Sequence, residues 1–131
     1  MAQFNLLGSS PAGFIAGGTI PVNTLVMLDS TAGQVVVTTG ITSLAVGAAM
    51  NSAVAGGLVQ VQQYGIAKLT AKSAITLGDQ VMPVGSGGGL IDNSAGATAK
   101  SIGIALTAAL ADGDVIEVML AIPPVFGPAN S

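Results

Sequence analysis

Three acidic side chains are the first candidates for chemistry in this sequence. Asp112, Asp114 and Glu117 fall close together in ADGDVIEV, and carboxylate oxygens at alternating positions suit a hard cation such as Ca²⁺. The ligand order of an EF-hand is absent, however, and Asp-Gly is a turn signal because glycine adopts a positive φ angle without steric cost. We therefore expect an acidic turn in water and assign no metal site, with cation binding between Asp112 and Glu117 as the alternative.

The residue types that most often perform catalysis are missing. The chain has no histidine and no cysteine, which removes the usual general base and the thiol nucleophile. Lys72 and Lys100 each precede a serine, but adjacent residues of an extended chain point to opposite faces, which disfavours a serine-lysine pair. The glycine run at 85–89 lacks the Gly-Lys-Ser/Thr ending of a phosphate loop. We expect a protein that is not an enzyme and has no cofactor.

Lys68 is the side chain for which a covalent role is an alternative. The stretch AKLTAKSAITLGDQV from Ala67 to Val81 looks like biotinyl and lipoyl carrier domains, in which a lysine at a hairpin tip is loaded covalently. Those domains place methionine or acidic residues beside that lysine. Lys68 lies between Ala67 and Leu69 instead, so a carrier domain ranks last among the functions considered.

Composition restricts the partners. The net charge is −3 and the lysines have no arginine beside them, so the chain is poorly suited to neutralise phosphates and we expect no nucleic-acid partner. The most apolar stretch, 44–61, is interrupted by Asn51 and by Gly56-Gly57, so we expect no membrane span. No lysine precedes Lys68, so a secretory signal is not expected and the chain is expected to be made in the cytoplasm.

The chain is too apolar to cover its own hydrophobic surface. Half of its residues are hydrophobic and 7% are charged, whereas about 25% of residues are charged in an ordinary soluble domain. A single domain of 131 residues buries only about two thirds of the surface of its unfolded chain. The excess apolar surface therefore has to contact other subunits.

Short β-branched runs between glycine-bearing turns predict an all-β fold, a small β-barrel or sandwich of short strands. In 58–63 the two valines alternate with glutamines, and in 115–120 Ile116, Val118 and Leu120 share one face, as expected of half-buried strands. The predicted strands are Leu25–Leu28, Gln34–Thr38, Ala45–Ala49, Leu58–Gln63, Ile66–Thr70, Val81–Val84, Ile102–Leu106 and Val115–Leu120.

A weak internal repeat runs through these strands, and as a duplication it predicts two similar β units packed as one barrel or sandwich. Val46 to Val61 superimposes on Ile102 to Glu117, and the stretch from Val26 superimposes on that from Val81. The aligned glycines are Gly47 with Gly103, Gly57 with Gly113, and Gly33 with Gly88. Accidental matches in a chain rich in alanine and glycine are the alternative.

The two ends differ from the middle. We expect an extended N-terminal arm at 1–20, a β-rich domain at 21–122 and a proline-rich C-terminal tail at 123–131. Such ends cannot form a core of their own, so their apolar side chains are predicted to contact other proteins. The predicted interface residues are Phe4, Leu6, Leu7, Phe14, Ile15, Val125 and Phe126.

The stretches AITLGDQVMP and SIGIALTAALADGDVIEVML resemble small bacteriophage capsid decoration proteins, also called cement proteins. The resemblance covers roughly residues 20 to 122. The matching positions are Ile75, Gly78, Asp79, Val81, Ile102, Gly103, Ala105, Gly113, Asp114, Val115 and Val118.

This resemblance implies a structural virion protein. Such a protein binds the outer surface of a phage head as a homotrimer and stabilises contacts between subunits of the major capsid protein. Its interface residues would then contact sister copies or the capsid. A trimeric head-fibre base or adhesin module is the alternative, ahead of the carrier domain.

Overall fold

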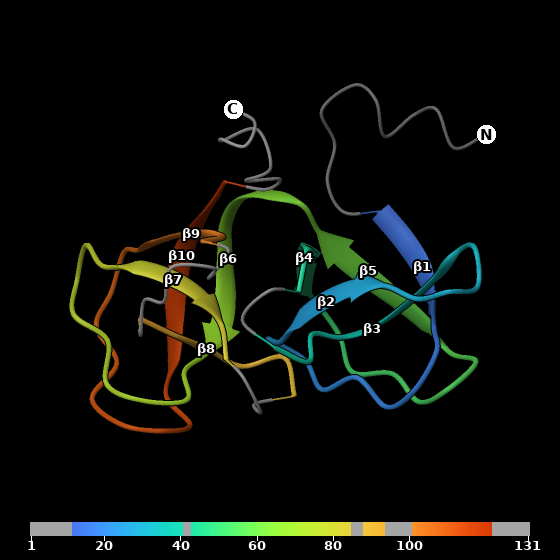
Figure 1. Ribbon diagram of the computed structural model, residues 1–131, viewed down its shortest axis with the longest axis horizontal. Helices are drawn as coiled ribbons and strands as arrows, with labels where there is room; N and C mark the ends of the chain where they lie inside the picture. Colours follow the sequence, from blue (N-terminus) through green and yellow to red (C-terminus); the bar gives the residue numbers. More distant parts are fainter. Residues whose placement is uncertain (1–11, 41–42, 85–87, 94–100, 122–131) are drawn as a thin grey trace.

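The computed structural model describes residues 12–40, 43–84, 88–93 and 101–121 (Figure 1). Over these residues the chain forms short strands joined by turns, and no helix, so nothing described there could cross a bilayer as a helix. The strands are β1 (Ala12–Ala16), β2 (Leu25–Leu28), β3 (Gln34–Val37), β4 (Ala45–Ala49), β5 (Leu58–Gln62), β6 (Tyr64–Thr70), β7 (Gln80–Pro83), β8 (Ile91–Asp92), β9 (Gly103–Ala105) and β10 (Val115–Ala121). The predicted all-β fold is confirmed.

Strands β1 to β5 form the first half, a closed barrel on the right of Figure 1. Its strand order is β1-β3-β2-β4-β5, with β1 antiparallel to β5 and parallel to β3. In β5, Val59 and Val61 are buried while the glutamines between and after them are partly exposed, as the alternation predicted. These valines pack with Val26 and Val35 in the core of the barrel.

Strands β6 to β10 form the second half, a sheet on the left of Figure 1 with the order β6-β10-β9-β7-β8. Ile116, Val118 and Leu120 of β10 are buried and the residues between them are exposed, which confirms the predicted core face. A parallel bridge between Ala71 and Ile91 brings the end of β6 beside β8. The second half is therefore a barrel that is nearly closed.

The two halves repeat the same fold, with β1 to β5 corresponding in chain order to β6 to β10. Equivalent backbone hydrogen bonds join equivalent strands and turns in each half. In the first half they connect Ile20 to Ala53, Gly56 to Ala16 and Asn23 to Ala49. In the second half the equivalent bonds connect Ile75 to Ala109, Gly113 to Ala71 and Gly78 to Ala105. The internal repeat suggested by the sequence is therefore visible in the structure, but the two units form separate sheets and not the single barrel or sandwich that was expected, because each pairs its own five strands.

The repeat differs in register from the sequence alignment at two turns. Gly113 corresponds to Gly56 rather than to Gly57, because both amides bond the end of an equivalent strand and both residues have a positive φ angle. One extra residue in the second-half link causes this offset. Gly33 likewise corresponds to Gly89 rather than to Gly88, since Gly33 and Gly89 each lie two residues before an equivalent buried strand residue.

Closure of the barrel is where the halves differ. In the first half, the Ile15 amide donates to the Gly33 carbonyl at 3.0 Å and helps to join β1 to β3. The equivalent groups in the second half are the Thr70 amide and the Gly89 carbonyl. Both bond the first half instead, because the segment 23–25 lies between them.

Segment 23–25 holds the two halves together. The Asn23 carbonyl accepts the Thr70 amide at 2.8 Å, and the Leu25 amide donates to the Gly89 carbonyl at 2.7 Å. The Leu25 side chain is fully buried in the core of the second half, where Ala48 of β4 joins it. The outer surface of the first barrel therefore completes the core of the second half.

Every strand predicted from the sequence is present, but β1 and β8 were not predicted. Strand β1 lies within the segment expected to be an arm, and its residues 12–15 pair with residues 61–58 of β5. The barrel thus begins at β1. Most of that expected arm, residues 1–11, and the predicted tail lie outside the described residues.

Candidate interaction surfaces

The predicted interface residues fall into two groups. Phe14 and Ile15 belong to β1, where Phe14 is half-buried and packs against the core of the first barrel. Ile15 points outward, with 39% of its surface exposed, and lies opposite Leu58. The remaining five, Phe4, Leu6, Leu7, Val125 and Phe126, lie outside the described residues. Of the set, Ile15 is therefore the residue that the structure presents on the surface.

The acidic stretch forms a turn held by its own carboxylates. Asp114 Oδ2 accepts the backbone amides of Leu110 at 2.7 Å and Ala111 at 3.2 Å, which fixes the turn before β10. Asp112 Oδ2 lies 3.7 Å from Lys72 Nζ in an exposed ion pair. Among the described residues no group of three acidic, histidine or cysteine side chains is arranged to hold a metal ion. The acids act as turn architecture.

A second carboxylate closes the turn before β7. Asp79 Oδ2 accepts the side-chain amide of Asn93 at 2.6 Å and the backbone amide of Thr76 at 3.0 Å. Both hydrogen bonds favour the ionised carboxylate, and the pKa of Asp79 is lowered, first by Asn93 and then by Thr76. Asp79 corresponds to Thr24 in the first half, whose hydroxyl donates to the Pro21 carbonyl at 2.7 Å.

Lys68 does not lie where a carrier domain would need it. It sits in the middle of β6, directly opposite Glu117 of β10, and not at a hairpin tip. Covalent carriers need the lysine at a tip so that it can reach a separate active site. The carrier-domain alternative is therefore removed.

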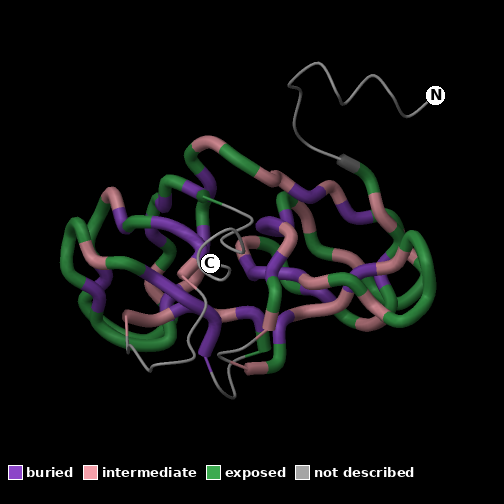
Figure 2. The backbone as a smooth tube through the Cα atoms, turned by 45° about the horizontal axis from the view of Figure 1, so that its top comes forward, coloured by how far each residue is buried: buried purple, intermediate pink, exposed green. Residues whose placement is uncertain are grey.

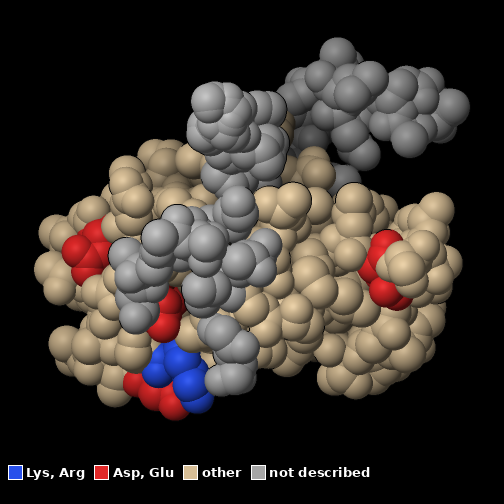
Figure 3. Space-filling model, in the orientation of Figure 1, with Lys and Arg blue, Asp and Glu red and all other residues tan. Residues whose placement is uncertain are grey.

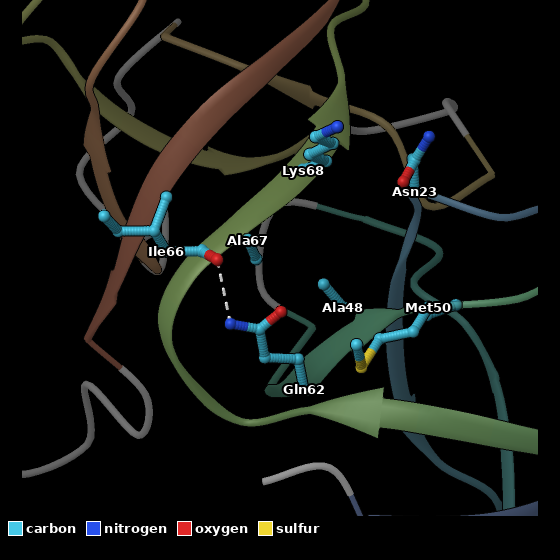
Figure 4. Close-up of a pocket in the computed structure, with 8 residues that line it drawn as sticks. Asn23, Ala48, Met50, Gln62, Ile66, Ala67 and Lys68 are labelled. Carbon is cyan, nitrogen blue, oxygen red and sulfur yellow. Dashed lines mark hydrogen bonds between the residues drawn. The ribbon is translucent and has the colours of Figure 1, made fainter.

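A pocket of ≈ 260 Å³ lies at the junction between the halves (Figure 4). Met50 and Gln62 line it from the first half, and Ile66 and Lys68 line it from the second. The Gln62 side-chain amide donates to the carbonyl of Ile66 at 2.9 Å and to that of Tyr64 at 3.0 Å. The Gln62 amide therefore bonds the backbone of the second half and is not available to a ligand. We interpret the pocket as a gap at the junction between the halves.

An apolar row crosses the outer face of the second sheet. The strand register places Met119 between Ile66 and Ile104, and 54%, 44% and 47% of Ile66, Met119 and Ile104 are exposed. In the first half, the positions of Met119 and Ile104 are held by Gln62 and Ala48, beside the junction. At these two positions the exposed apolar surface therefore belongs to the second half.

Two further apolar surfaces lie on loops and on the first residues of β5 and β10, and they are equivalent to each other. The first loop surface consists of Val22, Val54 and Leu58, and the second loop surface consists of Leu77, Leu110 and Val115. Their exposed fractions are 39%, 69% and 58% in the first and 64%, 84% and 49% in the second. The loops that carry both surfaces run along the lower edge of Figure 1, and Figure 2 shows them as largely exposed.

The loop surfaces are built on the repeated hydrogen bonds. The Ile20–Ala53 bridge holds the loops of the first surface together, and the Ile75–Ala109 bridge does so for the second. In the first half the Val22 amide also donates to Ser52 Oγ at 3.1 Å. A shallow pocket lined by Pro21, Val54 and Leu58 lies on the first loop surface. These surfaces were not predicted from the sequence, although the repeat places apolar residues at equivalent positions in both halves.

Charges are few on the face shown in Figure 3. Most of this face carries no ionised side chain, and the acidic and basic groups gather over the second half, with one acidic patch over the first. Such a surface suits apolar contact with other proteins rather than attraction of a highly charged ligand.

The comparisons agree with this reading. Residues 14–120 match the sequence profile of the phage cement proteins. The chain belongs to the phage cement protein family. It is therefore a structural protein associated with the phage head. No curated protein sequence matches the chain.

A solved structure shares the fold. The head fiber gp8.5 N base of bacteriophage phi29 superimposes with a TM-score of 0.70, over 86% of this chain and 93% of that chain, at 16% sequence identity. At this identity the likeness establishes the fold alone.

Proposed function

We propose that this chain is a capsid decoration protein without catalytic activity. It binds the outer surface of the phage head as a homotrimer and stabilises contacts between major capsid subunits. The observation that supports this most directly is apolar surface on a folded member of the cement family. The loop surfaces and the row Ile66–Met119–Ile104 are exposed, yet the chain has too few charged residues to keep such surfaces soluble alone.

Decoration of this kind needs no reaction. A protein that binds the assembled shell more tightly than the separated subunits stabilises the shell by mass action. Specific interfaces usually bury about 1,200 to 2,000 Å² in total. The acidic net charge of −3 also favours a place away from the packaged genome, on the outer surface.

A homotrimer is a closed assembly that would cover the remaining apolar surface. Closed cyclic symmetry lets each copy cover part of its neighbour without open-ended association. The row on the second sheet is available for such contacts, as is Ile15 on β1. Phe4, Leu6, Leu7, Phe14, Val125 and Phe126 remain proposed contacts, although Phe14 also serves the first core.

Heat resistance of phage heads tests this function. Purified chain is added to heads that were assembled without it, and genome release is followed as temperature rises. The chain is expected to bind and to raise the temperature of release, whereas heads given an unrelated acidic protein of similar size remain unchanged. Absence of binding to the heads would contradict the proposal. A chain lacking residues 1–11, which leaves β1 intact, tests the N-terminal contacts separately.

A base for a head fibre is the second candidate. The shared fold with the phi29 head fiber base favours this candidate. A fibre base would bind the head and also present a further protein or a host-surface ligand. Glycan binding or a stable complex with a separate fibre protein would support this candidate, and decorated heads without either would not.

A further inference from the structure

The two loop surfaces share exposed apolar side chains that the repeated fold itself does not require. The bridges Ile20–Ala53 and Ile75–Ala109 are repeated because they build the same barrel. The exposed apolar side chains do not build it, since their surfaces face solvent. Single exposed apolar residues are ordinary, but here three positions are apolar and exposed in both halves: Val22 and Leu77, Val54 and Leu110, and Leu58 and Val115.

Among the described residues, three other exposed apolar side chains have no exposed apolar counterpart, and exposed Met50 has the partly buried Leu106 as its counterpart. Ile15 corresponds to Thr70, Met119 corresponds to Gln62, and Ile104 corresponds to the buried Ala48. The exposed apolar positions that repeat in both halves thus lie on these loops and at the first residues of β5 and β10, along one edge (Figure 1). A repeated fold alone does not account for them.

Both loop surfaces lie along the same edge of the molecule (Figure 1). Their loops lie along the lower edge of Figure 1, whereas β1 begins and β10 ends at the upper edge. The loops of the first surface, 17–24 and 50–57, carry no charged residue. The second surface does carry charges: Asp112 pairs with Lys72, Asp114 accepts the backbone amides of Leu110 and Ala111, and Asp79 accepts the Thr76 amide and the Asn93 side chain. Because these groups are bonded within the chain, both surfaces favour an apolar protein site.

We propose that the two loop surfaces are equivalent contact sites, through which one chain binds the same site on two neighbouring copies of the major shell subunit. This inference rests on the proposed function, because it states how the chain contacts the head. Two equivalent sites on one chain call for a partner with identical copies side by side, which a phage shell provides. A closed trimer of this chain needs only one contact and its complement on each copy.

Bivalent contact gives a measurable signature. When two sites on one molecule bind together, the second binding event is intramolecular, and affinity exceeds that of either site by about 10² to 10⁴-fold. Loss of either loop surface should therefore weaken binding by a similar large factor. A chain that binds through one surface alone would be weakened by loss of that surface only.

Paired substitutions test this on heads assembled without the chain. The first variant carries Val54→Ser and Leu58→Ser, and the second carries Leu110→Ser and Val115→Ser. Each is expected to bind the heads about 100-fold more weakly than the unchanged chain. The control variant, Leu28→Ser with Leu44→Ser, removes exposed apolar side chains outside both loop surfaces and should bind within about threefold of it. Unfolding curves verify that each variant is folded.

The outcomes separate the inference from the proposed function. If the unchanged chain fails to bind heads, both fall. If it binds but one loop variant binds as well as the control, the inference alone is overturned. Electron cryomicroscopy of heads decorated with the unchanged chain gives a second measurement that needs no variant. Two copies of the shell subunit are expected against the two loop surfaces, and a loop surface left in solvent would overturn the inference.

Discussion

Asn23 and Gly78 occupy the same position in the two halves, and both have a positive φ angle, 65° and 90°. Each donates its backbone amide to an alanine carbonyl at the end of the neighbouring strand, Ala49 at 2.9 Å and Ala105 at 2.8 Å. Asparagine is among the few other residues that enter this region readily. The turn before β2 and β7 therefore requires this conformation, whichever residue supplies it.

Substitution of Gly78 by alanine should show the cost of that conformation by itself. No atom lies within 4 Å of the added Cβ, so the loss comes from the positive φ angle. We expect Gly78→Ala to lower the free energy of unfolding by about 1–2 kcal/mol, measured in urea. Gly18→Ala, also in open space but without a positive φ angle, is the matched control. Equal losses in both variants would contradict this explanation.

Gly47 and Gly103 are required for a different reason. A Cβ at Gly47 would collide with the carbonyl oxygen of Gln62, and one at Gly103 with that of Met119. Backbone on the adjacent strand cannot yield cheaply, so each alanine substitution should cost at least about 3 kcal/mol. Thermal unfolding of both variants measures the loss, with Gly40→Ala as the control in open space. A loss smaller than that of Gly78→Ala would show that the adjacent strand can move away from the added Cβ at little cost, which would contradict this explanation.

The sequence predicted the strands better than their closure. Alternation located β5 and β10 because one face of each is buried, which is the property that residue patterns report. Strand β1 was not predicted because its sequence, AGFIA, continues an uncharged terminal segment. Its place in the sheet comes from pairing with β5, a long-range contact that local patterns do not encode.

The interaction surfaces were predictable only in part. Apolar excess indicated contact with other proteins, but the expected residues were placed mainly at the ends of the chain. The repeat placed Val22 and Leu77 at equivalent positions, but the sequence did not indicate that both side chains are exposed. Insertion of segment 23–25 into the second half is a property of packing, and no residue pattern indicated it.

The shared core predicts that the two halves unfold together. Leu25 of the first half is fully buried in the core of the second, so neither half retains its core when the other unfolds. We expect one cooperative transition, with the circular dichroism and the fluorescence of Tyr64 changing together. Leu25→Ala should lower the free energy of unfolding by about 2–5 kcal/mol. Separate transitions in the unchanged chain would contradict a shared core.

Asp79 should make stability depend on pH in the acid range. Its pKa is lowered in the folded chain by the Asn93 amide and the Thr76 backbone amide. The resulting stabilisation is present above the ordinary aspartate pKa of about 3.9 and is lost as pH falls through the lower folded value. Asn93→Ala removes the larger cause while keeping the carboxylate, so the folded pKa should rise toward its ordinary value. Carbon-detected NMR titration of Asp79 measures this directly, and an unchanged pKa in Asn93→Ala would show that Asn93 is not the cause.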